Sequence, residues 1–144
     1  MSRVDFYILP DHKLQSMQLF ACKLTEKAWQ QGHKILIHTD SAEHSHALDD
    51  MLWTFKEGSF IPHAILGESI DDDQPILISH QDLTCDNIQL MINLSSQPAS
   101  ADSNYTRIAE IVNQDPQRKL SGREHYKVYR EKGYEMHHHE MSHS

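Results

Sequence analysis

The chain has 144 residues and a formal net charge of −8 at pH 7, with 38% hydrophobic and 24% charged residues. This length fits a single domain with a sizeable core. The acidic balance argues against a general nucleic-acid binder, whose nonspecific affinity comes from cations that neutralise phosphates. The widely separated Cys22 and Cys85 predict neither a disulfide framework nor a zinc site. No signal-peptide pattern and no apolar run of about 20 residues is present, so we expect a cytoplasmic protein that does not cross a membrane.

The first part of the sequence alternates between strand and helix patterns. Residues 4–9 form an apolar run rich in strand formers, and apolar residues then recur at helical spacing over 14–29, with Cys22 among them as a core residue. Residues 34–38 predict a second strand. A cap cluster, Thr-Asp-Ser, follows and predicts a second helix over 42–55. Strands joined by helices in this order predict a right-handed parallel unit.

The second part predicts further strands and two more helices. Residues 60–63 are expected to be extended, and residues 75–79 and 90–94 to form a third and a fourth strand. Their continuous apolar character is typical of a sheet that is covered on both faces. The apolar residues between 105 and 112 predict a helix that ends before Asp-Pro, and residues 117–132 predict the last helix.

These elements together predict the fold class. We expect an α/β protein with one Rossmann-like three-layer domain, a mostly parallel sheet of about four or more strands, and helices on both faces. The domain is expected to span residues 1–134, and residues 135–144, with four histidines, to form a flexible tail with incidental affinity for divalent metals. The first strand-to-helix turn, LPDHKLQS, has no glycine, and the chain has no P-loop, so no nucleotide-binding loop is expected.

A basic segment stands out near the end of the acidic chain. Residues 118–134 carry six basic residues against two acidic ones, a net charge of +4. Four of the basic residues follow one another at intervals of four, four and three residues. On a helix, this spacing places them along one face, with Tyr126 beside them. Such a face can receive an acidic partner that also has an apolar part. The alternative is a solvated helix face. The four cations are Lys119, Arg123, Lys127 and Arg130.

Two large aromatic residues suggest a second surface. Trp53 stands near the end of the second helix, next to Leu52 of its buried side, and Phe60 follows in a turn flanked by Gly58 and Ser59. Large aromatics at a helix end and an adjoining loop are typical of an interface. Buried packing of both rings is the alternative.

Two longer stretches resemble a known family. The sequences LDDMLWTFKEGSFIPHAILGE (48–68) and REHYKVYREKGYE (123–135) are similar to the two signature regions of the chi subunit of bacterial DNA polymerase III. The opening DFYIL and the segment AWQQGHKILI resemble the same family, so the similarity spans nearly the whole chain. This resemblance implies a clamp-loader accessory subunit with no catalytic activity of its own and no cofactor, acting as a component of the DNA-directed DNA polymerase holoenzyme.

The resemblance also implies two partners, with nucleic acid reached only indirectly. One is the psi subunit, which forms a heterodimer with chi and connects it to the clamp loader; the residues that correspond are Trp53, Phe60, Pro62 and His63. The other is the acidic C-terminal tail of single-stranded-DNA-binding protein. The residues of this chain that correspond to the tail-binding surface of the family are Arg123, Tyr126, Lys127 and Arg130. The histidine-rich tail has no family counterpart, so no contact is assigned beyond Gly133. The remaining alternative is a small nucleotide- or metal-binding α/β protein of unknown activity.

Overall fold

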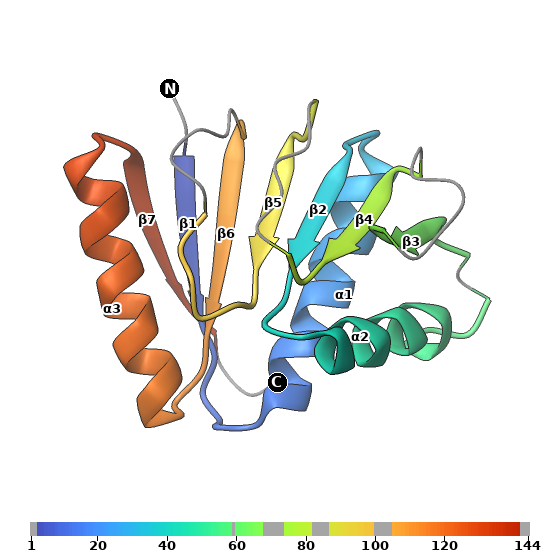
Figure 1. The fold of residues 1–144 in the computed structure, drawn as a ribbon, viewed down its shortest axis with the longest axis horizontal. Coiled ribbons are helices and arrows are strands. Elements are labelled where there is room, and N and C mark those ends of the chain that lie inside the picture. The colour runs from blue at the N-terminus through green and yellow to red at the C-terminus, as the bar shows by residue number, and fades with distance from the viewer. Residues whose placement is uncertain (1–2, 59, 68–73, 82–86, 100–104, 142–144) are drawn as a thin grey trace.

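A seven-stranded sheet forms the centre of the computed structural model, which describes residues 3–58, 60–67, 74–81, 87–99 and 105–141 (Figure 1). Every strand pair is parallel, and the strand order is β3-β4-β2-β5-β6-β1-β7, so β3 and β7 form the two edges. The strands are β1 (Arg3–Ile8), β2 (Ile35–His38), β3 (His63–Ile65), β4 (Ile76–Ser79), β5 (Leu90–Asn93), β6 (Arg107–Val112) and β7 (Glu135–Glu140). The helices are α1 (Leu14–Gln30), α2 (Ala42–Thr54) and α3 (Pro116–Glu131).

Helices cover both faces of the sheet, as the sequence predicted. Alternate residues of β2 show the two faces: Ile35 and Ile37 pack in a core with α1 and α2, whereas Leu36 belongs to a second core with residues of α3. Because neighbouring strand residues point to opposite faces, α1 and α2 lie on one side and α3 on the other. The apolar runs without alternation therefore correspond to strands that are buried on both faces.

The helix ends follow the local chemistry of the sequence. Ser41 caps α2, because its side chain accepts a hydrogen bond from the backbone N–H of His44 at 3.2 Å. Asp115 caps α3 in the same way through the N–H of Arg118, at 3.2 Å, and Pro116 stands at the first turn. Gly133, with a φ of +79°, then ends α3 and directs the chain into β7.

The helix predicted over residues 105–112 is wrong, because this segment contains β6, which lies inside the sheet between β5 and β1. Its residues are buried on both faces, so its apolar positions show no alternation and periodicity cannot distinguish a strand from a buried helix. The β-branched Ile108, Ile111 and Val112 favour the strand.

The prediction of a flexible tail is wrong for Glu135–Glu140, which form β7 at the edge of the sheet. β7 pairs in parallel with β1 over six residue pairs. The histidines that suggested a tail are accommodated because aromatic residues of β1 pack against them: the ring of His138 stacks on Phe6 and that of His139 on Tyr7.

Two further expectations concern the cysteines. Cys22 is a core residue, as predicted, and its burial raises the pKa of the thiol to about 12. Cys85 lies outside the described residues.

Candidate functional site

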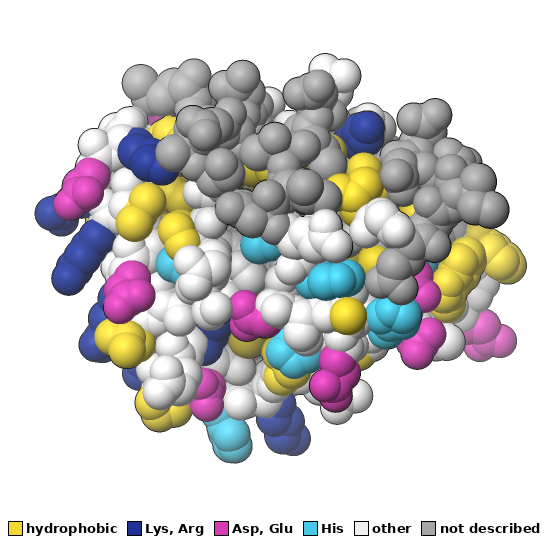
Figure 2. All heavy atoms as spheres, viewed as in Figure 1, with side chains coloured by type: hydrophobic (Ala, Val, Ile, Leu, Met, Phe, Trp, Pro, Cys, Tyr) yellow, Lys and Arg dark blue, Asp and Glu magenta, His cyan; other side chains and the backbone are white. Residues whose placement is uncertain are grey.

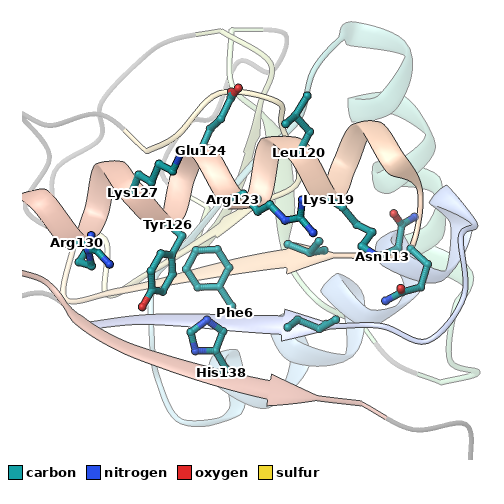
Figure 3. Close-up of a pocket in the computed structure, with 14 residues that line it drawn as sticks. Phe6, Asn113, Lys119, Leu120, Arg123, Glu124, Tyr126, Lys127, Arg130 and His138 are labelled. Carbon is teal, nitrogen blue, oxygen red and sulfur yellow. The ribbon is translucent and has the colours of Figure 1, made fainter.

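The main candidate site is a groove between α3 and the strands at the β7 end of the sheet (Figure 3). It has a volume of about 730 Å³. We call it the α3 groove; it is lined by Phe6, Ile8, Val112, Asn113, Gln114, Lys119, Leu120, Gly122, Arg123, Glu124, Tyr126, Lys127, Arg130 and His138. The apolar side chains of β1 and β6 form its base, and α3 forms one wall.

All four residues predicted to bind an acidic tail lie together in this groove. Arg123, Lys127 and Arg130 are exposed, and so is Lys119, the first cation of the row. None of these four cations forms an ion pair within the described part of the chain, whose recorded pairs all involve other residues. Their charges are therefore available to a ligand.

Tyr126 connects the cations to the apolar base. The residue is half-buried, and the centre of its ring lies 5.8 Å from that of Phe6 and 5.3 Å from that of His138. The groove thus offers an aromatic surface below a row of exposed cations. An anionic peptide with one apolar side chain has the matching chemistry.

Gly122 brings α3 close to the sheet beside the groove. A Cβ atom at this position would lie 3.0 Å from Cγ2 of Val112, which is closer than side chains normally approach. The absence of a side chain therefore sets the distance between α3 and β6.

A buried polar network fixes α3 on the sheet. At its centre is the fully buried carboxylate of Glu110, which faces α3 from β6. Its oxygens contact Nδ1 of His125 at 2.9 Å and accept hydrogen bonds from the amide of Asn93 at 2.7 Å and the hydroxyl of Tyr129 at 2.6 Å. Because His125 and Tyr129 belong to α3 and Asn93 to β5, the network joins three elements.

Arg118 completes this network from the first turn of α3. Its guanidinium donates to the backbone carbonyls of Ile111 at 2.9 Å and Asn93 at 3.1 Å, and also to that of Ser95. Its Nη2 lies 3.5 Å from a carboxylate oxygen of Glu110. The cation therefore satisfies carbonyls at the ends of β5 and β6 and balances the buried anion.

The network shifts the pKa values of both central groups. Burial alone would raise the pKa of Glu110, but the hydrogen bond and charge of His125 and the charge of Arg118 outweigh it, so the pKa is lowered. Burial would likewise lower the pKa of His125, yet the hydrogen bond and charge of Glu110 raise it. Both shifts favour a charged pair in the folded protein.

We predict that His125→Ala lowers the free energy of unfolding by about 3–5 kcal/mol, because it leaves the carboxylate of Glu110 buried without its nearest cation. The raised pKa of His125 means that its contribution is complete below about pH 6.5 and is lost as pH rises through the folded-state pKa. Urea denaturation between pH 6 and 9 measures both effects. His12→Ala, at an exposed histidine, is the control; an identical pH profile for His125→Ala and the wild type would contradict the charged pair.

The second predicted surface lies at the β3 edge of the sheet. The side chain of Phe60 is 78% exposed and that of Trp53 49%, and Pro62 is also exposed. We call these three residues the aromatic surface. Between Phe60 and Pro62, Ile61 is fully buried and anchors the segment to the core. Buried packing of Trp53 and Phe60, the alternative considered for the sequence, is therefore excluded.

His63 does not share this exposure, although it was predicted with the same group. Its side chain is buried, with Nδ1 2.6 Å from the carbonyl of Ile61 and Nε2 3.1 Å from a carboxylate oxygen of Asp49. The centre of its ring lies 4.5 Å from that of Trp53. His63 therefore supports the indole of Trp53 from inside the fold.

The two surfaces occupy opposite ends of the molecule, since α3 lies near β7 and α2 near β3 (Figure 1). Figure 2 shows Lys and Arg side chains gathered on the side of α3, and a group of hydrophobic side chains on the opposite side. A partner at one end leaves the other end accessible.

The turn after β1 is not suited to a nucleotide. Asp11 accepts hydrogen bonds from the N–H of Lys13 at 3.0 Å and from the hydroxyl of Ser16 at 2.7 Å. A carboxylate thus stands at the start of α1, where a phosphate would bind in a nucleotide-binding α/β protein. Within the described ranges, no group of three or more His, Cys, Asp or Glu residues is arranged to hold a metal ion. No helix there is long and apolar enough to span a bilayer.

Comparison with solved structures finds proteins with a similar fold. The chain superposes on the structure of Mss116p DEAD-box helicase domain 2 bound to an RNA duplex with a TM-score of 0.61 and 14% identity, covering 96% of this chain and 64% of that one. With T4 UvsW the TM-score is 0.64 and the identity 9%, over 96% and 41% of the two chains. At these identities the likeness shows the fold alone. The protein is thus an α/β domain with a parallel sheet, and its fold is similar to those of these two structures.

Comparison with sequence families is more specific. The family model described as "DNA polymerase III chi subunit, HolC" matches residues 1–137. The subunit chi of Pseudomonas aeruginosa is 34% identical over 98% of both chains, and that of Haemophilus influenzae 32% over 92% of both. The Escherichia coli subunit is 26% identical over 94% of this chain and 96% of its own. The chain belongs to the DNA polymerase III chi subunit family.

Sequence reasoning missed several residues that shape the groove. Phe6 was assigned only to a strand, and His138 to a tail. Glu110 and His125 were not singled out, although one signal was present: a glutamate within an apolar run, as in residues 108–112, requires buried partners if the run is in the core.

Proposed function

We propose that this protein is a non-catalytic accessory subunit of the bacterial replicative DNA polymerase III holoenzyme. It bridges the clamp loader, through the psi subunit, to the acidic C-terminal tail of single-stranded-DNA-binding protein. Membership of the chi family supports the place in the holoenzyme. The observation that carries the bridging role is the α3 groove, in which a row of cations without an ion pair among the described residues stands above aromatic side chains.

The groove has the chemistry that an acidic tail requires. The guanidinium groups of Arg123 and Arg130 can each hold a carboxylate through two hydrogen bonds, and Lys127 adds a point charge. The ring of Tyr126, next to Phe6, offers an apolar face to the last side chain of the tail. Because the cations are exposed, the affinity is expected to fall as the salt concentration rises.

The aromatic surface is the proposed contact for psi. Trp53, Phe60 and Pro62 present apolar area to solvent, whereas the buried His63 holds Trp53 in place. His63 therefore acts as a positioning residue for the contact. An apolar interface of this kind depends on salt much less than the groove does.

The position of the two surfaces supports simultaneous binding of both partners. They lie at opposite edges of one sheet, β3 and β7, so that neither partner has to displace the other. A rigid parallel sheet with helices on both faces keeps the two contacts at a fixed separation.

We predict that Arg123→Ala weakens binding of a peptide that copies the acidic tail by about 1–3 kcal/mol, because it removes a charge-assisted contact, while psi binding persists. Isothermal calorimetry on folded protein measures the affinity. The control is Lys132→Ala, which removes an exposed cation just beyond α3 that does not line the groove. An unchanged affinity for Arg123→Ala would count decisively against the assignment.

We predict that Phe60→Ala abolishes co-purification with psi, because it removes a large apolar side chain from the proposed contact. The fold and peptide binding should stay intact, because this side chain is largely exposed. Size-exclusion chromatography of the protein mixed with purified psi checks the complex. Leu14→Ala, at another exposed apolar residue, is the control. Co-elution of Phe60→Ala with psi would refute the proposed contact.

A further inference from the structure

The α3 groove has a second wall that the family resemblance did not supply. β7 forms this wall, and His138 is its residue within the groove (Figure 3). In the parallel register His138 lies beside Phe6, and the two rings stack with centres 5.6 Å apart and planes 19° apart. The ring of Tyr126, on α3, is 5.3 Å away. Three aromatic rings from three elements thus meet in the groove.

The position of His138 is fixed by contacts on the other face of β7. Nε2 of the next residue, His139, lies 2.8 Å from a carboxylate oxygen of the buried Asp5, and its ring stacks on Tyr7 at 4.9 Å. Burial would raise the pKa of Asp5, but hydrogen bonds from Arg3, His139 and Arg107 lower it to about 2. Asp5 is therefore anionic and holds β7 against β1.

The charges that face His138 favour an anionic ligand between the two walls. The charged residues of α3 that line the groove are the row of four cations and one acidic residue, Glu124. From β1 the groove receives only the apolar side chains of Phe6 and Ile8. On β7 itself, Glu140 shares the face of His138 by strand alternation, whereas His137 and His139 point to the opposite face, toward Glu135 and Asp5.

We propose that His138 regulates the α3 groove as a proton-dependent cation, so that affinity for an acidic peptide rises as pH falls from 8 to 6. This inference rests on the proposed function of the groove. Histidine is the side chain whose charge changes between about pH 5 and 8. When neutral, the imidazole is one ring of the aromatic base. When protonated, it becomes a further cation opposite the α3 row, and a carboxylate of the peptide lies between the two.

The sign of the effect follows from linkage. A bound carboxylate favours the protonated imidazole, so a lower pH must favour the bound peptide. The carboxylates of the peptide do not contribute, since aspartate side chains remain ionised above about pH 5.5. His139 contacts Asp5 on the opposite face of the sheet and so does not face the ligand.

The test measures binding of a synthetic peptide, several aspartates followed by one apolar C-terminal residue, by calorimetry at pH 6 and pH 8 and constant ionic strength. We expect the wild type to bind about two- to fivefold more tightly at pH 6, which corresponds to one additional exposed ion pair. His138→Phe keeps the stack on Phe6 and carries no proton, so its affinity should be equal at both values of pH.

His137→Asn is the matched control, because it removes the neighbouring histidine of the same strand from the opposite face. This variant should keep the full pH effect, and circular dichroism confirms the fold of each variant at both values of pH. A wild type that binds equally at pH 6 and 8, or a His138→Phe variant that keeps the difference, would overturn the role of His138 and leave the proposed function intact. A wild type that does not bind the peptide at either pH would overturn the proposed function itself.

Discussion

The position of α3 depends on the hydrogen bonds and ion pairs of the buried carboxylate of Glu110. A charge with no access to solvent is stable only when its partners are present together, and these come from β5 through Asn93 and from α3 through Arg118, His125 and Tyr129. An apolar contact would allow α3 to slide along the sheet, whereas directional hydrogen bonds allow one position. The α3 groove exists because this position leaves space between α3 and the outer strands.

Local sequence patterns predicted much of the fold, and their failures have a common cause. In a helix with one buried face, such as α3, the apolar residues recur with the helical period. In a strand that is buried on both faces, the apolar residues show no alternation. Residues 105–112 were therefore assigned to a helix although they contain β6. Glu110 in this segment does not distinguish a helix from a strand locally, because the partners of its carboxylate lie far away in the chain. His125 is 15 residues distant and Asn93 is 17.

The candidate site shows the same division between local and distant information. The steps between Arg123, Lys127 and Arg130 place these cations on one side of a helix, so the basic wall of the groove was predictable. The base and the second wall were not, because Phe6 and His138 meet only through the parallel pairing of β1 with β7, two strands from opposite ends of the chain. No pattern within the last residues distinguishes an edge strand of this kind from a tail.

The sheet topology gives the protein two ends with different chemistry. At the β3 edge, Ile61 and the buried His63 hold Trp53 and Phe60 toward solvent, so a partner proposed to bind there would gain its energy from the burial of apolar area. At the β7 edge, the exposed cations of α3 would bind the proposed acidic tail with an energy that falls as the ionic strength rises. A single domain can therefore keep a salt-resistant contact at one end while the other end exchanges its ligand. This difference agrees with the proposed function, in which one partner stays bound while the other is gripped and released.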